Sequence, residues 1–261
     1  MKSGGSSRVT AVVLGGGDAG DPLAQAAGVA AKALVPYQGK PLAHYVLEAL
    51  AVSGVVDDCV YVGPPPALEN TAGTLACRVV PAGHSLAASL AIGLEASLAR
   101  GPARLLVVTA DLPWLSGEAV AHFVRQAPTT ALVYPIVSRR SALAQFPGQR
   151  RTFVRLREGS FTGGNLLLIE PDVVHALLPL LERAYRARKN PLALASLLGP
   201  RILAGFLTGR LGVPVLEARV SRLLGAGARA FETPHACLGA DADKTEHLQA
   251  PSGQADAPEA V

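Results

Sequence analysis

Hydrophobic residues along the first two thirds of the chain alternate between short runs and longer stretches with helical spacing. The short runs, rich in valine and leucine, lie at residues 8–14, 55–62, 77–80, 104–109 and 131–137. Such runs are typical of buried strands. Residues 40–53 and 85–98 carry apolar side chains at the spacing of an amphipathic helix, and a further helix is expected to begin near Ser116. This alternation predicts a three-layer α/β/α fold with a mostly parallel sheet.

After these elements the pattern changes. Residues 165–169 predict one more strand, and residues 171–224 have an almost continuous helical pattern. A last strand is expected at 228–232. We therefore expect one domain over residues 1–248, with a helical insertion at about 171–224. Residues 249–261 have the composition of a disordered tail.

Composition narrows the classes of partner. Aromatic residues make up only 5% of the chain, which argues against stacking on single-stranded nucleic acid, and a net charge of +4 suits an anionic small molecule. Cys59, Cys77 and Cys237 are far apart and form no C-x-x-C spacing, so neither a disulfide framework nor a zinc site is expected. With no apolar leader and no run of about eighteen apolar residues, we expect a cytoplasmic protein with no membrane or nucleic-acid partner.

The first strand ends in a glycine-rich loop, Leu14-Gly15-Gly16-Gly17-Asp18-Ala19-Gly20. Glycines let backbone N–H groups approach a phosphate closely. The loop also satisfies G-x-G-x-x-G, the pattern of dinucleotide-binding proteins. That interpretation requires a helix beginning inside the loop and a carboxylate at the end of the second strand. Here Asp21-Pro22 precedes any helix, and the second strand ends in Tyr61-Val62-Gly63-Pro64, so an NAD(P)-dependent oxidoreductase is the weaker alternative.

The segment Val12–Leu42 resembles the signature of the MobA-like nucleotidyltransferases, relatives of the sugar-1-phosphate, cytidylyl and guanylyl transferases. Their pattern is a strand, L-x-G-G-x-G, an interval, P-K-x-L and then G-K-P-L. In this chain the lysine is Lys32, and Gly39-Lys40-Pro41-Leu42 closes the segment. The resemblance implies a Rossmann-like, GT-A-like nucleotidyltransferase fold. It also implies that the loop binds the triphosphate of an NTP, with Lys32 as a catalytic residue that neutralises it.

The chain departs from this pattern at two places. Ala31 stands where proline is expected, and the usual arginine after the loop glycines is missing. Lys32, or an arginine from elsewhere in the chain, then has to supply the missing positive charge.

Asp111 follows the apolar run at 104–109, within Ala110-Asp111-Leu112-Pro113. This position is the carboxyl edge of the predicted sheet, where open α/β sheets place ligands. Phosphoryl transfer commonly uses Mg²⁺ held by one or two carboxylates. On the residues alone, a turn or N-cap aspartate is the alternative. Residues 105–120 also resemble the family's strand, D-x-P-x-L and helix, which implies that Asp111 is catalytic and a metal ligand.

A second carboxylate is expected far away in the sequence. Residues 239–248, Gly-Ala-Asp-Ala-Asp-Lys-Thr-Glu-His-Leu, resemble the family's late D-x-D-x-P-x-D-L element. This resemblance implies that Asp243 is the second metal ligand, with Asp241 as the alternative. Thr245 and His247 replace the usual proline and aspartate, and an exposed acidic turn is the other interpretation of the segment.

Two further loops resemble substrate-binding loops of the family. Gly83, His84 and Ser85 precede a helix and resemble the loop that contacts the nucleobase, although Ser85 also fits an N-cap and His84 a surface position. Gly163, Gly164 and Asn165 resemble the acceptor-side Gly/Asn loop, with a hairpin turn as the alternative.

Six arginines and no acidic residue lie between positions 139 and 157. Guanidinium groups bind phosphate with two parallel hydrogen bonds. Arg151 and Arg155 are the first candidates to bind the acceptor's phosphate, and a solvated basic loop is the alternative.

Together these observations predict a Mg²⁺-dependent nucleotidyltransferase. It would transfer the NMP of an NTP to a phosphorylated small-molecule acceptor and release pyrophosphate. A nucleotide-binding regulatory protein without turnover is the alternative, and nucleotide binding without pyrophosphate release would favour it. The sequence specifies neither the base, the acceptor nor the oligomeric state.

Overall fold

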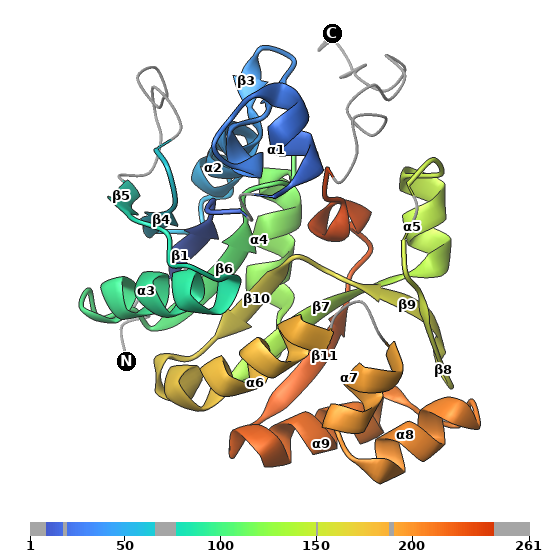
Figure 1. Cartoon of the computed structure of the whole chain (residues 1–261). Helices are drawn as coiled ribbons and strands as arrows, with labels where there is room; N and C mark the ends of the chain where they lie inside the picture. The colour runs from blue at the N-terminus through green and yellow to red at the C-terminus, as the bar shows by residue number, and fades with distance from the viewer. Residues whose placement is uncertain (1–8, 18–19, 66–76, 150, 188–190, 243–261) are drawn as a thin grey trace, which may run out of the picture.

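The computed structural model describes residues 9–17, 20–65, 77–149, 151–187 and 191–242, and these residues form a central sheet between two helical layers (Figure 1). Within the described residues the sheet has nine strands. They are β1 (Val9–Leu14), β4 (Asp58–Val62), β5 (Cys77–Val80), β6 (Arg104–Thr109), β7 (Leu132–Ser138), β8 (Val154–Leu156), β9 (Gly159–Gly163), β10 (Leu166–Ile169) and β11 (Ala228–Glu232). A separate small hairpin joins β2 (Pro36–Tyr37) and β3 (Lys40–Pro41).

One half of the sheet is parallel, in the order β5-β4-β1-β6. The register aligns Leu14 at the end of β1 with Val62 of β4 and Thr109 of β6. Three strands therefore end in one row, and the loops that follow them meet at a single edge of the sheet.

The other half is mainly antiparallel, with β10 between β6 and β7. Strands β9 and β10 both pair with the same edge of β7, because β11 occupies its other edge. Gly163 pairs with Ile136, whereas Leu168 pairs with Val133, so the register advances by two residues between these pairs. Gly164 and Asn165 form the bulge that separates β9 from β10.

The helices are α1 (Pro22–Ala27), α2 (Leu42–Val52), α3 (Leu86–Leu98), α4 (Gly117–Gln126), α5 (Arg139–Gln145), α6 (Val174–Ala187), α7 (Pro191–Leu197), α8 (Pro200–Leu207) and α9 (Val213–Leu224). Short 3₁₀ turns are η1 (Lys32–Leu34), η2 (Pro171–Val173) and η3 (Ala236–Gly239). Helices α2 and α4 cover one face of the sheet, and α3 and α6 cover the other (Figure 1). The predicted fold class, a mixed, mostly parallel sheet in a three-layer α/β/α arrangement, is thereby confirmed.

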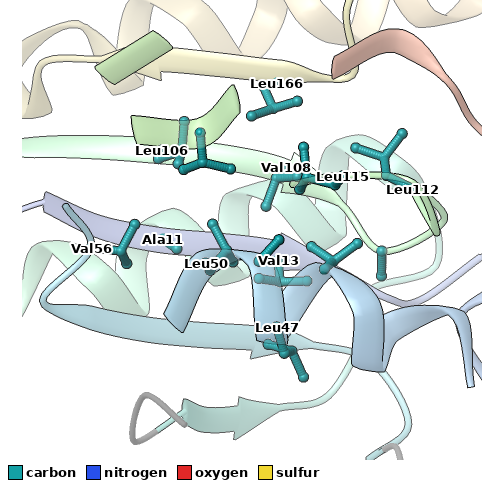
Figure 2. Packing of buried hydrophobic residues seen from close by; sticks show 14 of the residues in the cluster. Ala11, Val13, Leu47, Leu50, Val56, Leu106, Val108, Leu112, Leu115 and Leu166 are labelled. Carbon is teal, nitrogen blue, oxygen red and sulfur yellow. The ribbon is translucent and has the colours of Figure 1, made fainter. Parts of the chain in front are cut away.

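The main core lies between the parallel strands and α2 and α4. Figure 2 shows Val13 of β1 beside Leu50 of α2, and Val108 of β6 and Leu47 of α2 belong to the same cluster. Burying a side chain of this size stabilises the fold by roughly 1.5–3 kcal/mol. This packing fixes β1 and β6, and with them the loops at their ends.

Residues 171–224 hold α6 to α9, in agreement with their helical pattern. Helix α6 packs on the sheet, while Ile202 of α8 joins a small cluster with Leu156 and Phe161 of the β8–β9 hairpin. This hairpin and α5 replace the solvated basic loop that is one interpretation of residues 139–157. No helix in the described part of the chain is both long and apolar enough to cross a membrane.

Candidate active site

The glycine-rich loop is packed tightly against the end of β4. The N–H groups of Gly15 and Gly16 both donate to the Val62 carbonyl oxygen, at 2.8 and 2.9 Å. A methyl group added to Gly15 would lie 2.0 Å from the Tyr61 hydroxyl, and one added to Gly16 would lie 2.3 Å from Ala82 Cβ. The two glycines are therefore required by space, because a side chain at either position would overlap a neighbouring residue.

Lys32 lies directly across from this loop. A methyl group added to Gly17 would lie 3.6 Å from Lys32 Cβ. Lys32 Nζ forms an ion pair with Asp111 Oδ2 at 2.8 Å, and the two side chains are only 12% and 18% exposed. The structure thus brings together the two residues that the sequence predicts to be catalytic.

Asp111 stands at the carboxyl edge of the parallel half, as its position after β6 indicates. The Ala110 N–H donates to the Leu14 carbonyl oxygen at 3.1 Å, which ties the end of β6 to the glycine loop. The second carboxylate oxygen, Asp111 Oδ1, is buried and has no hydrogen-bond partner in the described part of the chain. A buried carboxylate oxygen without a partner is costly unless a cation binds it. This oxygen therefore fits a metal ion.

The late acidic element lies beside Asp111. The Ala242 N–H donates to the Asp111 backbone carbonyl at 3.0 Å, so the neighbouring Asp241 is held in the same region. Asp243, the first choice for a second metal ligand, lies outside the described residues. Residues within the described ranges contain no cluster of three or more His, Cys, Asp or Glu side chains that could hold a metal. Mg²⁺ needs no such cluster, because it commonly takes one or two carboxylates together with substrate phosphates.

The loop predicted to contact the nucleobase adjoins the glycine loop through Ala82. Ser85 caps α3, where its side chain accepts a hydrogen bond from the Ala88 N–H at 3.1 Å. The Gly83 N–H donates to Ser89 Oγ at 3.1 Å, and His84 is exposed. The structural role foreseen for Ser85 is therefore present, and His84 is open to solvent beside the loop.

The Gly164–Asn165 bulge joins the second half of the sheet to the site. The Thr109 N–H donates to the Asn165 carbonyl oxygen at 3.2 Å, and the Asn165 N–H donates to the Leu238 carbonyl oxygen at 2.8 Å. The bulge is thus held between the end of β6 and η3, which leads to Asp241. The alternative of a hairpin turn with a left-handed asparagine is wrong, because Asn165 does not have a positive φ.

Arg151 reaches the same place from the segment after α5. Its guanidinium donates to Gln149 Oε1 at 3.2 and 2.6 Å and lies 5.9 Å from the ring centre of Phe146. A methyl group on Gly239 would lie 3.0 Å from Arg151 Nη1 and 2.8 Å from the Gly163 carbonyl oxygen. Arg155 is exposed on the edge strand β8, opposite Ser160. Of the two predicted arginines, Arg151 is the one that adjoins the bulge.

Sequence patterns did not indicate several residues that shape this site. Trp114 packs against Phe146, with ring centres 5.6 Å apart, and Phe146 in turn lies under the Arg151 guanidinium. Tyr134 of β7 places its hydroxyl 2.0 Å from the position of a methyl group on Gly163. Tyr134 is 40% exposed, and its hydroxyl can donate a hydrogen bond beside the bulge. In the sequence these residues stand out only as aromatic, and an aromatic residue is as common in a hydrophobic core as in a binding site.

The sheet order, the glycine loop and the Lys32–Asp111 pair define the class of protein, a nucleotidyltransferase. Residues 11–209 match the model of the MobA-like NTP transferase domain, and the chain belongs to that family. A solved structure of a hypothetical transferase from Thermus thermophilus is 44% identical, with a TM-score of 0.80, and the match covers 92% of this chain and 99% of that one. The resemblance inferred from the sequence is confirmed.

Two other comparisons give a partial sequence match and a likeness of fold. A phosphoenolpyruvate guanylyltransferase from Sphaerobacter thermophilus is 35% identical over 88 residues, which are 33% of this chain and 42% of that protein. The match thus spans less than half of the curated relative. A solved 4-diphosphocytidyl-2C-methyl-D-erythritol synthase from Anaerococcus prevotii has a TM-score of 0.56 at 9% identity, over 94% of this chain and 96% of that one. At that identity the likeness shows the fold alone.

Proposed function

We propose that this chain is a Mg²⁺-dependent nucleotidyltransferase that transfers the NMP of an NTP to a phosphorylated small molecule and releases pyrophosphate. The observation that carries the proposal is the buried Lys32–Asp111 pair beside the glycine loop, with Asp111 Oδ1 left without a partner. A cation for phosphate and a carboxylate for a metal stand side by side, as the reaction requires. We treat residues 1–248 as one domain, because β11 returns to β7 after the helical segment.

In the proposed reaction an oxygen of the acceptor's phosphate attacks the α-phosphorus. The bond from the α-phosphorus to the bridging oxygen breaks, and pyrophosphate leaves with the electron pair. Lys32 neutralises the triphosphate as charge develops on the leaving group. Asp111 and a carboxylate of the 241–243 segment would hold Mg²⁺, which supplies further positive charge at the phosphoryl oxygens. No side chain has to act as a covalent nucleophile.

The Lys32–Asp111 ion pair implies an exchange of partners on binding. Lys32 Nζ lies 2.8 Å from Asp111 Oδ2, so the two side chains are paired with each other in the absence of substrate. Triphosphate would draw Lys32 away while the accompanying metal takes Asp111. The metal is therefore expected to enter as its complex with the nucleotide.

For the substrates, we propose GTP as the donor and a phosphorylated carboxylic acid as the acceptor. The support is the name of the relative that is 35% identical over 88 residues, a phosphoenolpyruvate guanylyltransferase. Arg151, fixed by Gln149 beside the Gly163–Gly239 contact, is suited to a carboxylate or phosphate of such an acceptor.

The test is pyrophosphate release, measured with ATP, GTP, CTP and UTP in turn. Each NTP is combined with phosphoenolpyruvate, a sugar 1-phosphate or molybdopterin, with and without Mg²⁺, and products are identified by mass. Release with one NTP that requires Mg²⁺ is expected. Nucleotide binding without release for every acceptor would favour a regulatory protein, and binding of NAD(P) alone would overturn the proposal.

A further inference from the structure

The Tyr61 hydroxyl is buried beneath the glycine loop without a partner. Tyr61 is 0% exposed on β4, and within the described ranges no group accepts or donates a hydrogen bond to its oxygen. Buried tyrosine hydroxyls usually find a partner, because an unmade bond costs free energy of folding. Thr109 Oγ1 and Asp111 Oδ1, at and just after the end of β6, are likewise buried without a hydrogen-bond partner in the described residues. Unpartnered polar atoms thus gather around the edge of the sheet where the nucleotide is proposed to bind.

The hydroxyl points at the backbone of Gly15. It occupies the place of a Gly15 side chain, at 2.0 Å from where a methyl group would stand. The ring belongs to the same core cluster as Ala33, the residue after Lys32. The hydroxyl therefore lies under the loop, between its backbone and the core, and not on the solvent side.

In this conformation the first N–H groups of the loop are bonded to the protein itself. Those of Gly15 and Gly16 are both directed at the single carbonyl oxygen of Val62. Loops that bind phosphate do so with outward N–H groups. For Gly16 N–H to face outward, the Gly15–Gly16 peptide must turn over, which two adjacent glycines allow. The same rotation carries the Gly15 carbonyl toward the Val62 carbonyl oxygen, which cannot donate to it, so the Gly15 carbonyl needs another donor.

We propose that Tyr61 is a positioning residue of the nucleotide site, whose hydroxyl donates to the Gly15 carbonyl when the Gly15–Gly16 peptide turns to present its N–H to the triphosphate. The inference rests on the proposed function, because it assumes that this loop binds a triphosphate. Burial raises the pKa of Tyr61, so the hydroxyl keeps its proton and remains a donor.

The test variant is Tyr61→Phe, which keeps the ring against Gly15 and removes only the oxygen. Without nucleotide its Tm is expected to equal or exceed that of the wild type, because no existing bond is lost. With Mg²⁺ and GTP, and no acceptor, Kd is expected to rise about tenfold, since the inward carbonyl would lack its donor. Calorimetric titration measures this Kd without turnover, using another NTP if the pyrophosphate assay selects one.

Tyr45→Phe is the matched control. The Tyr45 hydroxyl donates to the Tyr37 carbonyl oxygen at 2.7 Å. Because this bond is lost, the variant should have a lower Tm than the wild type but the same affinity for the nucleotide. Equal affinity of Tyr61→Phe and wild type for the NTP would overturn the inference, as would a clearly lower Tm of nucleotide-free Tyr61→Phe. Failure of the wild-type chain to bind any NTP would instead overturn the proposed function.

Discussion

The parallel and antiparallel halves of the sheet contribute to the site in different ways. In the parallel half, Gly15 and Asp111 simply follow the ends of β1 and β6, which the register aligns. In the antiparallel half, Gly164 and Asn165 interrupt a strand as a bulge, and Arg151 arrives from a loop. Parallel strands place their loops at one edge by topology alone. Antiparallel strands need an irregularity to point groups toward that edge.

The proposed division of labour follows from this difference. The parallel half would hold the triphosphate and the metal, and the antiparallel half would hold the acceptor. Variants in one half should then change the kinetics of one substrate only.

The largest effect is expected in the parallel half, from Asp111→Asn. Removing the charge from the proposed metal ligand should lower kcat/KM roughly 10³-fold. The Tm should fall only modestly, since the variant weakens the ion pair with Lys32 while Oδ1 makes no bond in the described structure. Pyrophosphate release measures the first quantity and thermal denaturation the second. Full activity in this variant would contradict the metal assignment.

Much of the parallel half could be predicted from sequence. The run at 104–109 has the bounds of β6, and Ser116 is the N-cap of α4. These elements are long, apolar and regularly spaced, so periodicity identifies them. The resemblance to the family implied a catalytic role for Lys32 and for Asp111, but their ion pair was not predicted from the sequence.

The antiparallel half was harder to predict. Strand β8 has three residues, and β9 contains Gly159, Gly163 and two hydroxyl residues, so neither shows a hydrophobic run. The hairpin is stabilised instead by contacts such as Phe161 with Ile202, which are distant in sequence. The placement of Arg151 beside Gly239 likewise depends on tertiary packing.

Comparing the two predicted arginines sharpens the assignment of the acceptor side. Arg151→Ala should raise the acceptor KM about 10- to 100-fold, because it removes charge-assisted hydrogen bonds. Arg155→Ala should leave this KM unchanged, since Arg155 is exposed on β8. Initial rates at saturating NTP measure both. Similar effects of the two variants would show that the arginines act only through general charge.

A pair of glycine variants tests whether each half of the sheet binds a different substrate. If both variants affected the same substrate, the proposed division would be wrong. Alanine at Gly15 would meet Tyr61, and alanine at Gly164 would lie 2.8 Å from Pro135 Cγ. Each should cost about 1–3 kcal/mol through overpacking. Gly15→Ala should weaken NTP binding, whereas Gly164→Ala should raise the acceptor KM. Gly148→Ala is the control, because no atom in the described part of the chain lies within 4 Å of the added methyl group.

The smallest expected effect is on the pH dependence of stability, through His235 in the segment that leads to Asp241. Burial lowers the pKa of His235, helped by His122, while Glu118 acts in the opposite direction. The unfolded chain therefore binds this proton more readily, and stability falls as pH decreases from the ordinary value of 6.5 through the lowered value. His235→Gln should reduce this loss, as measured by urea unfolding at pH 5 and pH 8. An unchanged pH dependence would assign the loss to other groups.

The hydrogen bond from Ala242 to Asp111 has a consequence for synthesis of the protein. Translation produces the glycine loop first, Asp111 midway and Ala242 more than a hundred positions later. The strands of the parallel half all precede this segment in the chain, whereas the hydrogen bond to Asp111 can form only after Ala242 has emerged from the ribosome. Asp111 is therefore synthesised long before the segment that bears Asp241.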